Sequence, residues 1–325
     1  MTHSDNTWAV VLAAGSGTRL QALTTTADGV CVPKQFCSLR GGRTLLLDAV
    51  GRALQLAPAS RIVIVVAADH ECWWSPQLRG LSRANVLVQP RNVGTAAGLA
   101  LAVAAIRARD PRANVAVLAS DHHVDDPSVL RAAHADALAV TRRQPERIVL
   151  LGITPDEPDS EYGWIVPGPG DDSARGVATF VEKPGLARAT ELMRSGGVWN
   201  SFLMAARAET LWQLVAARLP FLTTRLAAAF AAAPAMRSRA LDEAYASMPV
   251  ADFSRDVLQG NEDRLAVQIV PPCGWTDLGT PSRVAQRVAQ LDTEGVPARA
   301  PWFATVDLRA ALLAQRARHA IATPA

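Results

Sequence analysis

The sequence predicts an α/β fold with a mostly parallel sheet and helices on both of its faces. Short apolar runs rich in β-branched residues, the type that forms fully buried parallel strands, recur along the first half of the chain. Between these runs lie longer stretches with apolar residues at helical spacing, and this alternation is typical of layered α/β proteins. With 325 residues, 49% of them hydrophobic, the chain is long and apolar enough for one large core.

The first half of the chain contains five predicted strands and three predicted helices. The strands are Trp8–Ala13, Arg61–Ala67, Asn85–Gln89, Asn114–Ala119 and Arg147–Gly152. The helices are Thr44–Leu56, Gly98–Arg109 and Asp126–Arg142. The third helix has a clear start, because Asp126 can accept a hydrogen bond from the first turn and Pro127 fits the first helical position.

The second half of the chain is predicted to add three strands and several helices. The strands Tyr162–Pro167 and Val177–Val181 are separated by a turn rich in Gly, Pro and Asp at residues 168–173, and a late strand covers Leu265–Val270. The helices are Leu186–Arg194, Glu209–Ala217, Leu222–Ala232, Arg239–Ser247, Pro281–Leu291 and a last one near Leu308–Arg316. No internal repeat and no long linker divides the chain.

Composition restricts the classes of partner and compartment. The formal charge of +3 is small for this length and does not favour nucleic acid, and every apolar run is too short to span a membrane. Met1–Asn6 lacks the basic and apolar regions of a signal peptide. The four cysteines, Cys31, Cys37, Cys72 and Cys273, show no metal-type pairing. We therefore expect a reduced, cytoplasmic protein that binds neither membranes nor nucleic acid.

The loop after the first strand, Ala14–Leu20, predicts a phosphate-binding site. Its residues are small up to Arg19, so backbone N–H groups can surround phosphate oxygens, and its glycines can adopt positive φ. Arg19 offers a planar cation that binds phosphate in two places. Lys34, held behind the rigid Pro33, adds a point charge.

Three known interpretations of a glycine loop compete for this segment. A dinucleotide-binding loop needs a third glycine where Leu20 stands, and an acid about 20 residues on, yet the next strand, Arg61–Ala67, lies much further along. A Walker-type loop needs Gly-Lys, a pair that this sequence does not contain. A plain strand-to-helix turn without a ligand is the third interpretation, and a lone Gly-x-Gly would favour it.

Asp121 is a predicted ligand of Mg²⁺. The motif Ser120-Asp121-His122 follows the strand Asn114–Ala119, and ligands of open parallel sheets bind beyond the carboxyl ends of strands. Magnesium takes few carboxylates and shares phosphate oxygens, so an acid opposite a phosphate loop suits it. The alternative is a helix cap, a role for which Asp126 is better placed.

Three further motifs carry polar residues, and the first and the third follow predicted strands. In Glu182-Lys183, the lysine suits a sugar phosphate and the glutamate suits sugar hydroxyls, although such a pair alone is more often a surface ion pair. Asn200 offers a donor and acceptors to a hydroxyl-rich ligand, and alone would be a turn residue. Asp277 is either a second carboxylate on the metal or the N-cap of the helix that begins at Pro281.

Taken in order, these motifs resemble the bacterial mannose-1-phosphate guanylyltransferase-like sugar-1-phosphate nucleotidyltransferases. The resemblance rests on Ala-Gly-Ser-Gly-Thr-Arg-Leu, Pro-Lys-Gln-Phe, Ser-Asp-His, Tyr-Gly-Trp-Ile, Val-Glu-Lys-Pro, Trp-Asn-Ser and Trp-Thr-Asp-Leu-Gly, between Trp8 and about Arg283. It implies a Rossmann-like sheet of nucleotide-diphospho-sugar transferase type in residues 1–283. Residues 284–325 would then be a C-terminal helical extension packed on that domain.

The resemblance also implies a reaction and a set of site residues. GTP and mannose 1-phosphate would give GDP-mannose and pyrophosphate, with Mg²⁺ as cofactor. The nucleotide would be bound by Ala14, Gly15, Gly17, Thr18, Arg19, Lys34, Gln89, Gly94 and Thr95. The sugar phosphate would be bound by Tyr162, Gly163, Glu182, Lys183 and Asn200, and the metal by Asp121 and Asp277. Arg19, Lys34 and Asp121 would act in catalysis.

Departures from the family pattern leave the substrates open. The chain has Ala13-Ala14 in place of Gly-Gly, Gln21-Ala22 where a proline is usual, an altered loop at Thr24–Val32 and Phe202 in place of a glycine. The stretch Gln89–Ala96 blends the guanylyl pattern with the Gly-Thr-Ala of uridylyltransferases. UTP or CTP with another hexose 1-phosphate, and a non-catalytic nucleotide-sugar-binding protein, remain alternatives. The oligomeric state stays open too, a homo-oligomer included.

Overall fold

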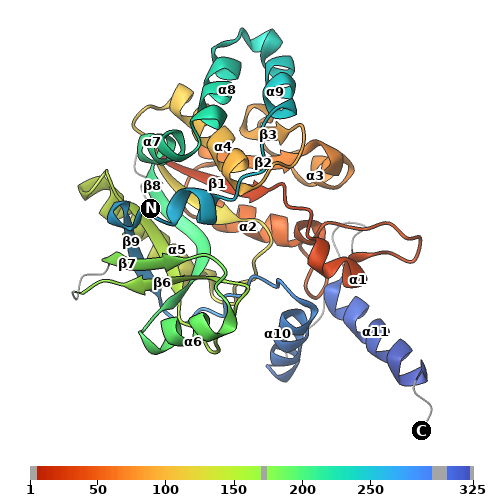
Figure 1. Ribbon diagram of the computed structural model, residues 1–325. Helices are drawn as coiled ribbons and strands as arrows, with labels where there is room; N and C mark the ends of the chain where they lie inside the picture. The colour runs from red at the N-terminus through yellow and green to blue at the C-terminus, as the bar shows by residue number, and fades with distance from the viewer. Residues whose placement is uncertain (1–5, 170–173, 295–305, 323–325) are drawn as a thin grey trace.

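The first strand, β1 (Thr7–Ala13), shows how the core is divided. In the computed structural model, which describes residues 6–169, 174–294 and 306–322, β1 is buried on both faces. Trp8 and Val10 pack into one hydrophobic cluster, and Ala9 and Val11 pack into another, because successive side chains of a strand point to opposite faces. The sheet therefore lies between two helical layers, as predicted (Figure 1).

The described strands form one sheet in the order β3-β2-β1-β4-β8-β5-β9-β7-β6. The remaining strands are β2 (Ile62–Ala67), β3 (Val86–Gln89), β4 (Asn114–Ala119), β5 (Ile148–Ile153), β6 (Gly163–Pro167), β7 (Arg175–Val181), β8 (Val198–Arg207) and β9 (Leu265–Val270). All eight predicted strands are confirmed, with ends that move by two residues at most. The half made of β3, β2, β1 and β4 is parallel throughout.

Strand β8 is the one described strand that the sequence pattern does not predict. Its ten residues pair antiparallel with β4, β5 and β6, so β8 lies in the middle of the sheet. The α/β class is confirmed, but the sheet is mixed rather than mostly parallel. The strand is hidden in the sequence because Asn200 and Ser201 interrupt its apolar pattern and are poor strand formers.

Helices cover both faces of the sheet, as predicted. Their bounds are α1 (Gln21–Thr24), α2 (Leu45–Leu54), α3 (Glu71–Gln77), α4 (Thr95–Arg109), α5 (Pro127–Arg143), α6 (Leu186–Arg194), α7 (Ala208–Arg218), α8 (Pro220–Ala231), α9 (Arg237–Ala246), α10 (Pro281–Thr293) and α11 (Leu308–Ala322). One face is covered by α4, α7, α8 and α9, and the other by α2 and α5 with α10 and α11 (Figure 1). None of the described helices is both long and apolar enough to cross a membrane. The short helices α1 and α3 are not predicted from the sequence.

Two helix starts are set by local chemistry. The Asp126 side chain accepts a hydrogen bond from the Ser128 backbone at 2.9 Å and Pro127 opens α5, which confirms the predicted cap. Helix α4 begins three residues earlier than predicted, after Gly94. This glycine has φ +93°, and a Cβ atom there would lie 2.1 Å from the Ala251 carbonyl oxygen, so only glycine allows that close approach.

The segment before α11 is joined to the N-terminal third of the chain. The Ser38 N–H donates to the Val306 carbonyl at 3.0 Å, and the Leu308 N–H donates to the Ser38 carbonyl at 2.9 Å. Helix α11 begins next to α1 and extends away from it at one end of the molecule (Figure 1). The predicted division at residues 283 and 284 falls inside α10 and stays a prediction. Part of the predicted extension, residues 295–305 and 323–325, lies outside the described residues.

Candidate active site

The predicted site residues meet where β1 and β4 end. Leu12 of β1 lies beside Ala119 of β4 in a parallel ladder, so the glycine loop and Asp121 leave the sheet at the same edge. Three neighbouring hollows open there. We call them the large cavity of about 370 Å³, the loop hollow of about 250 Å³ and the polar hollow of about 180 Å³.

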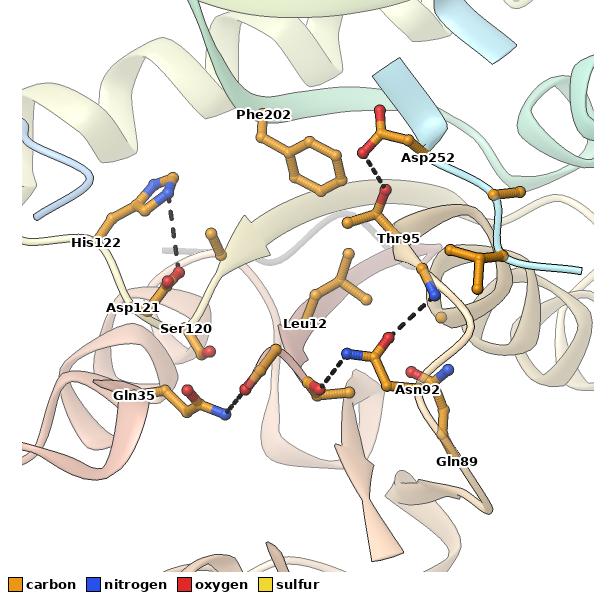
Figure 2. A pocket seen from close by; sticks show the side chains of 17 residues that line it. Leu12, Gln35, Gln89, Asn92, Thr95, Ser120, Asp121, His122, Phe202 and Asp252 are labelled. Atoms are coloured by element: carbon orange, nitrogen blue, oxygen red, sulfur yellow. Dashed lines mark hydrogen bonds and ion pairs between the residues drawn. The ribbon is translucent and has the colours of Figure 1, made fainter. Parts of the chain in front are cut away.

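The nucleotide-binding residues predicted from the resemblance fall into two of these hollows. The large cavity is lined by Ala14, Gly15, Gln89, Gly94 and Thr95, together with residues that include Asn92, Asp121, Phe202 and Asp252 (Figure 2). The loop hollow is lined by Gly17, Thr18, Arg19, Leu20, Lys34, Asp121 and Gly279. Asp121 lines both, so the two hollows adjoin at this carboxylate.

Lys34 is a buried cation that links the two predicted metal ligands. Its Nζ lies 2.8 Å from Oδ2 of Asp121 and also donates to the backbone carbonyl of Asp277. Burial pushes the pKa of both aspartates upward, but the charge of Lys34, helped at Asp277 by Arg283, outweighs it and lowers both pKa values. Both carboxylates are therefore ionised at neutral pH.

Gln35 holds the glycine loop in place. Its Nε2 donates to the carbonyl of Ala13 at 3.0 Å and to that of Gly15 at 2.8 Å, and the side chain is almost fully buried. The loop also packs closely on Lys34, since a Cβ atom at Gly17 would lie 3.0 Å from the Lys34 backbone nitrogen. Gln35 is not among the residues predicted for the site. Its position directly after Lys34 in the sequence is the observation that could have identified it.

The polar hollow gathers every residue predicted to bind the sugar phosphate. It is lined by Tyr162, Gly163, Glu182, Lys183 and Asn200, with Asp277 and Arg19 among the other residues. Oε2 of Glu182 is buried without a hydrogen-bond partner among the described residues. Burial, with the nearby charge of Asp252, raises the pKa of Glu182 to about 7. This oxygen is free to accept a hydrogen bond from a ligand hydroxyl.

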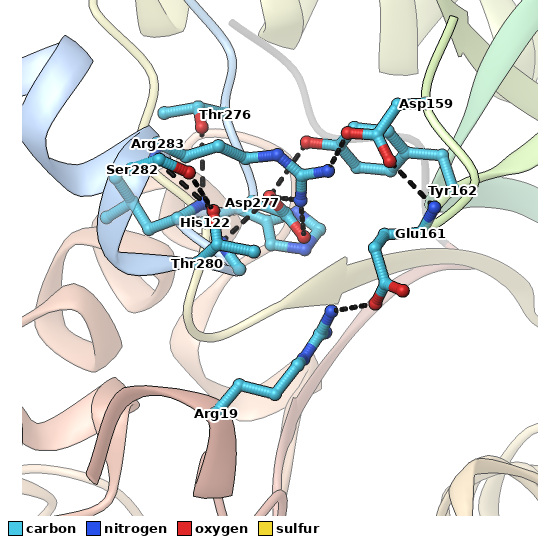
Figure 3. Close-up of polar contacts among 12 residues, drawn as sticks. Arg19, His122, Asp159, Glu161, Tyr162, Thr276, Asp277, Thr280, Ser282 and Arg283 are labelled. Carbon is cyan, nitrogen blue, oxygen red and sulfur yellow. Dashed lines mark hydrogen bonds and ion pairs between the residues drawn. The ribbon is translucent and has the colours of Figure 1, made fainter. Parts of the chain in front are cut away.

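Arg19 lines both the loop hollow and the polar hollow. In Figure 3 its guanidinium reaches toward Glu161, and Nη1 lies 2.8 Å from the Glu161 carboxylate. Both side chains are about half exposed, with 49% and 48% of their surface accessible. An exposed ion pair contributes little stability, so Arg19 can exchange Glu161 for a phosphate at low cost.

Asp277 sits in a network that the sequence does not predict. Its carboxylate accepts hydrogen bonds from the Tyr162 hydroxyl at 2.7 Å and from Nη1 of Arg283 at 2.9 Å (Figure 3). Arg283 also pairs with Asp159 and lies over the Tyr162 ring. The alternative role of Asp277 as a helix cap is wrong, because Thr280 caps α10.

Backbone strain gathers around the polar hollow. Within the described part of the chain, the non-glycine residues with positive φ are Lys183 (48°), Phe202 (63°) and Leu278 (47°). Lys183 and Phe202 line the polar hollow, and Leu278 follows Asp277, which also lines it. Strained residues of this kind concentrate at ligand sites, where the surrounding structure holds them in place.

His122 joins the large cavity to the polar hollow. Its ring is buried, packs edge-on against Trp275, and has its Nδ1 3.2 Å from the indole nitrogen of that tryptophan. Burial lowers the pKa of His122 to about 4, so the ring is neutral at pH 7 and its Nδ1 can accept the indole N–H. The residue shapes the site without adding charge.

This sheet, with its glycine loop and its hollows at the strand ends, is the fold of the nucleotide-diphospho-sugar transferases. A solved structure described as a mannose-1-phosphate geranyltransferase from Thermus thermophilus superposes with a TM-score of 0.76 and 31% identity, over 88% of this chain and 80% of that one. A UDP-glucose pyrophosphorylase solved with UDP-glucose, at 15% identity and a TM-score of 0.54 over 89% of this chain and 99% of that one, shares the fold.

The chain belongs to the nucleotidyl transferase family, whose model matches residues 8–294. It is 32% identical over 283 residues to a mannose-1-phosphate guanylyltransferase of Escherichia coli (strain K12), and 34% identical over 285 residues to mannose-1-phosphate guanylyltransferase ManC of Salmonella typhimurium. Each comparison covers 83% of this chain and 57% of the relative. The chain thus spans little more than half the length of these curated relatives.

Proposed function

We propose that the protein transfers a guanylyl group from GTP to mannose 1-phosphate, which gives GDP-mannose and pyrophosphate. The names of the curated relatives support the substrates. The observation that carries the reaction class is the position of Lys34, which contacts Asp121 and Asp277 between the glycine loop and the polar hollow. A cation there faces the point at which two phosphates would meet.

In the proposed reaction, a phosphate oxygen of the sugar 1-phosphate attacks the α-phosphorus of the nucleotide in line. The new O–P bond forms as the α–β bridging bond breaks, and its electron pair leaves with pyrophosphate. The nucleophile is already anionic, so no strong general base is needed, and catalysis consists of positioning and charge neutralisation. Lys34 neutralises the α-phosphate, Arg19 and the loop amides hold the leaving pyrophosphate, and Lys183 holds the sugar phosphate.

Asp121 fits the proposed role of magnesium ligand better than Asp277 does. The Asp121 side chain is 35% exposed and ionised, and its Oδ1 lies 3.9 Å from the nearest imidazole nitrogen. A hard oxygen donor beside phosphates is what Mg²⁺ prefers, and the bound ion would neutralise phosphate charge. The carboxylate of Asp277 is already engaged by Tyr162 and Arg283, so ligation through it requires those contacts to loosen.

A screen of pyrophosphate release tests the proposal. The four nucleoside triphosphates are each combined with mannose 1-phosphate and glucose 1-phosphate, with Mg²⁺ and with a chelator in its place. We expect release with GTP and mannose 1-phosphate, and none with the chelator. A different preferred pair would correct the substrates and keep the chemistry. Binding of GDP-mannose without release from any pair would favour a non-catalytic nucleotide-sugar-binding protein.

A further inference from the structure

Phe202 has a backbone conformation that bulky side chains rarely adopt. It lies within β8, and its φ of +63° is in the left-handed region that favours glycine. The ladder to β5 pairs Met204 and Asn200 of β8 but passes over residues 201–203 between them, so Phe202 lies in an irregular stretch of the strand. Such strain in a bulky residue persists only where the surrounding structure holds it.

Two buried side chains hold this conformation in place. Oδ1 of Asn200 accepts a hydrogen bond from the Phe202 N–H at 3.1 Å, and Oγ of Ser201 accepts one from the Leu203 N–H at 3.2 Å. Asn200 and Ser201 are 8% and 1% exposed. The facing ladder also changes register, between Leu150 and Gly152 of β5. Such irregularities redirect a side chain, and they recur next to active sites.

The redirected ring forms a wall between two hollows. Phe202 lines both the large cavity and the polar hollow. The ring meets Phe253 edge-on at 6.2 Å between centroids, so it is supported from behind. Figure 2 shows Phe202 over the large cavity, between His122 and Thr95. A ring held in this way limits how far a ligand can extend from one hollow toward the other.

We propose that Phe202 is a specificity-determining residue that restricts the sugar to hexose 1-phosphates bearing only hydroxyl groups, and that it excludes those with an acetamido group. This inference rests on the proposed function. The polar hollow of about 180 Å³ is smaller than the roughly 300–1,000 Å³ of ordinary ligand pockets, so little spare room remains beside the ring. Rejection by a steric wall is a common source of specificity.

Two substitutions, Phe202→Gly and Phe202→Ala, test the wall. With GTP as the nucleotide, kcat/KM is measured for mannose 1-phosphate and for N-acetylglucosamine 1-phosphate. We expect both variants to raise the ratio of the second value to the first by about tenfold or more, the scale of a size-based discrimination. Phe202→Gly also removes the backbone strain, so its melting temperature should lie above that of Phe202→Ala. Phe221→Ala, at a ring that is 44% exposed on α8, is the matched control and should leave the ratio unchanged.

The outcomes separate this inference from the proposed function. If the wild-type enzyme is active and both folded Phe202 variants have the same ratio of kcat/KM values as the wild type, Phe202 does not determine sugar specificity. The proposed function would then still stand. A wild-type protein that releases no pyrophosphate from any pair would overturn both. If Phe202→Ala does not fold, the ratio in Phe202→Gly decides, because glycine fits the backbone at this position.

Discussion

At the residue scale, the clearest prediction concerns the effect of Lys34 on kcat. Lys34→Met keeps most of the volume but removes the charge that faces Asp121 and Asp277. We expect kcat to fall by about 10²–10³-fold, roughly 3–4 kcal/mol of transition-state stabilisation, the usual cost of one electrostatic contact to a developing charge. Pyrophosphate release at saturating substrates measures it.

Arg239→Ala is the matched control for Lys34→Met. It removes a cation whose ion pair with Glu243 lies on the exposed surface of α9. Exposed pairs of this kind contribute little, so kcat should stay at the wild-type value. Equal activity in Lys34→Met and the wild type would contradict the role given to the lysine.

Glu182 makes a prediction about pH. Its folded pKa of about 7 lies above the ordinary value of 4.5, so the folded state keeps a proton that the unfolded state has released. The stability this gives is present below pH 4.5 and is lost as the pH rises through 7. Glu182→Gln removes this titration, so the variant should gain stability relative to the wild type between pH 5 and about 8.

Urea unfolding at several pH values measures this difference. The useful quantity is the difference in unfolding free energy between Glu182→Gln and the wild type, since other titrating groups cancel in it. Parallel pH profiles for the two proteins would mean that Glu182 titrates normally in the folded state.

The sequence allows single residues to be proposed for the site where each carries chemistry by itself. Asp121 and Glu182 follow strand ends and Lys34 follows a rigid proline, so their positions and residue types make them candidates for the site. Arg283 and Asp159 could not be recognised in this way. Their contact joins positions 124 residues apart, and each is an ordinary surface residue type until the fold places it beside Tyr162 and Asp277.

At the element scale, strand β8 shows where prediction of strands from apolar periodicity fails. Apolar periodicity identifies the other eight strands because apolar residues recur through each of them. In β8 the same positions also serve the site, so Asn200 and Ser201 replace apolar residues and hide the strand. The antiparallel pairs of β4 and β5 all involve this strand, and the pairs β6–β7 and β7–β9 add antiparallel neighbours that do not.

The junction between β3 and α4 gives the element-scale prediction. Gly94→Ala places a Cβ atom 2.1 Å from the Ala251 carbonyl oxygen at a residue with φ +93°. Because backbone must move, we expect a loss of about 2–4 kcal/mol in the free energy of unfolding. Gly80→Ala is the matched control, since no atom lies within 4 Å of its added Cβ and its φ is not positive.

Denaturant unfolding of both variants gives the two free energies of unfolding that test this prediction. The Gly80→Ala variant should stay within about 0.5 kcal/mol of the wild type. A Gly94→Ala variant as stable as Gly80→Ala would mean that the segment at Ala251 moves aside freely, and that its contact with Gly94 does not fix the wall of the large cavity.

At the scale of the whole molecule, the C-terminal helix is part of the same core as the first strand. Leu308 and Leu312 of α11 are buried in the cluster that contains Ala9 and Val11 of β1. Arg40 and Arg309 both bind the Asp292 carboxylate, so α10, α11 and the N-terminal third meet at one acid. We therefore expect α11 to unfold together with the sheet.

Leu308→Ala tests this cooperative unfolding. Leu308 is fully buried, and truncating a buried leucine costs about 2–5 kcal/mol through lost burial and a cavity. Leu313→Ala, on the same helix at 46% exposure, should change the free energy of unfolding by about 0.5 kcal/mol or less. Urea unfolding followed by tryptophan fluorescence and by circular dichroism should give one shared transition at a lower midpoint for Leu308→Ala. Two separate transitions, or equal midpoints for the two variants, would mean that α11 is a separately folding extension, because a helix outside the cooperative unit cannot transmit its loss to the sheet.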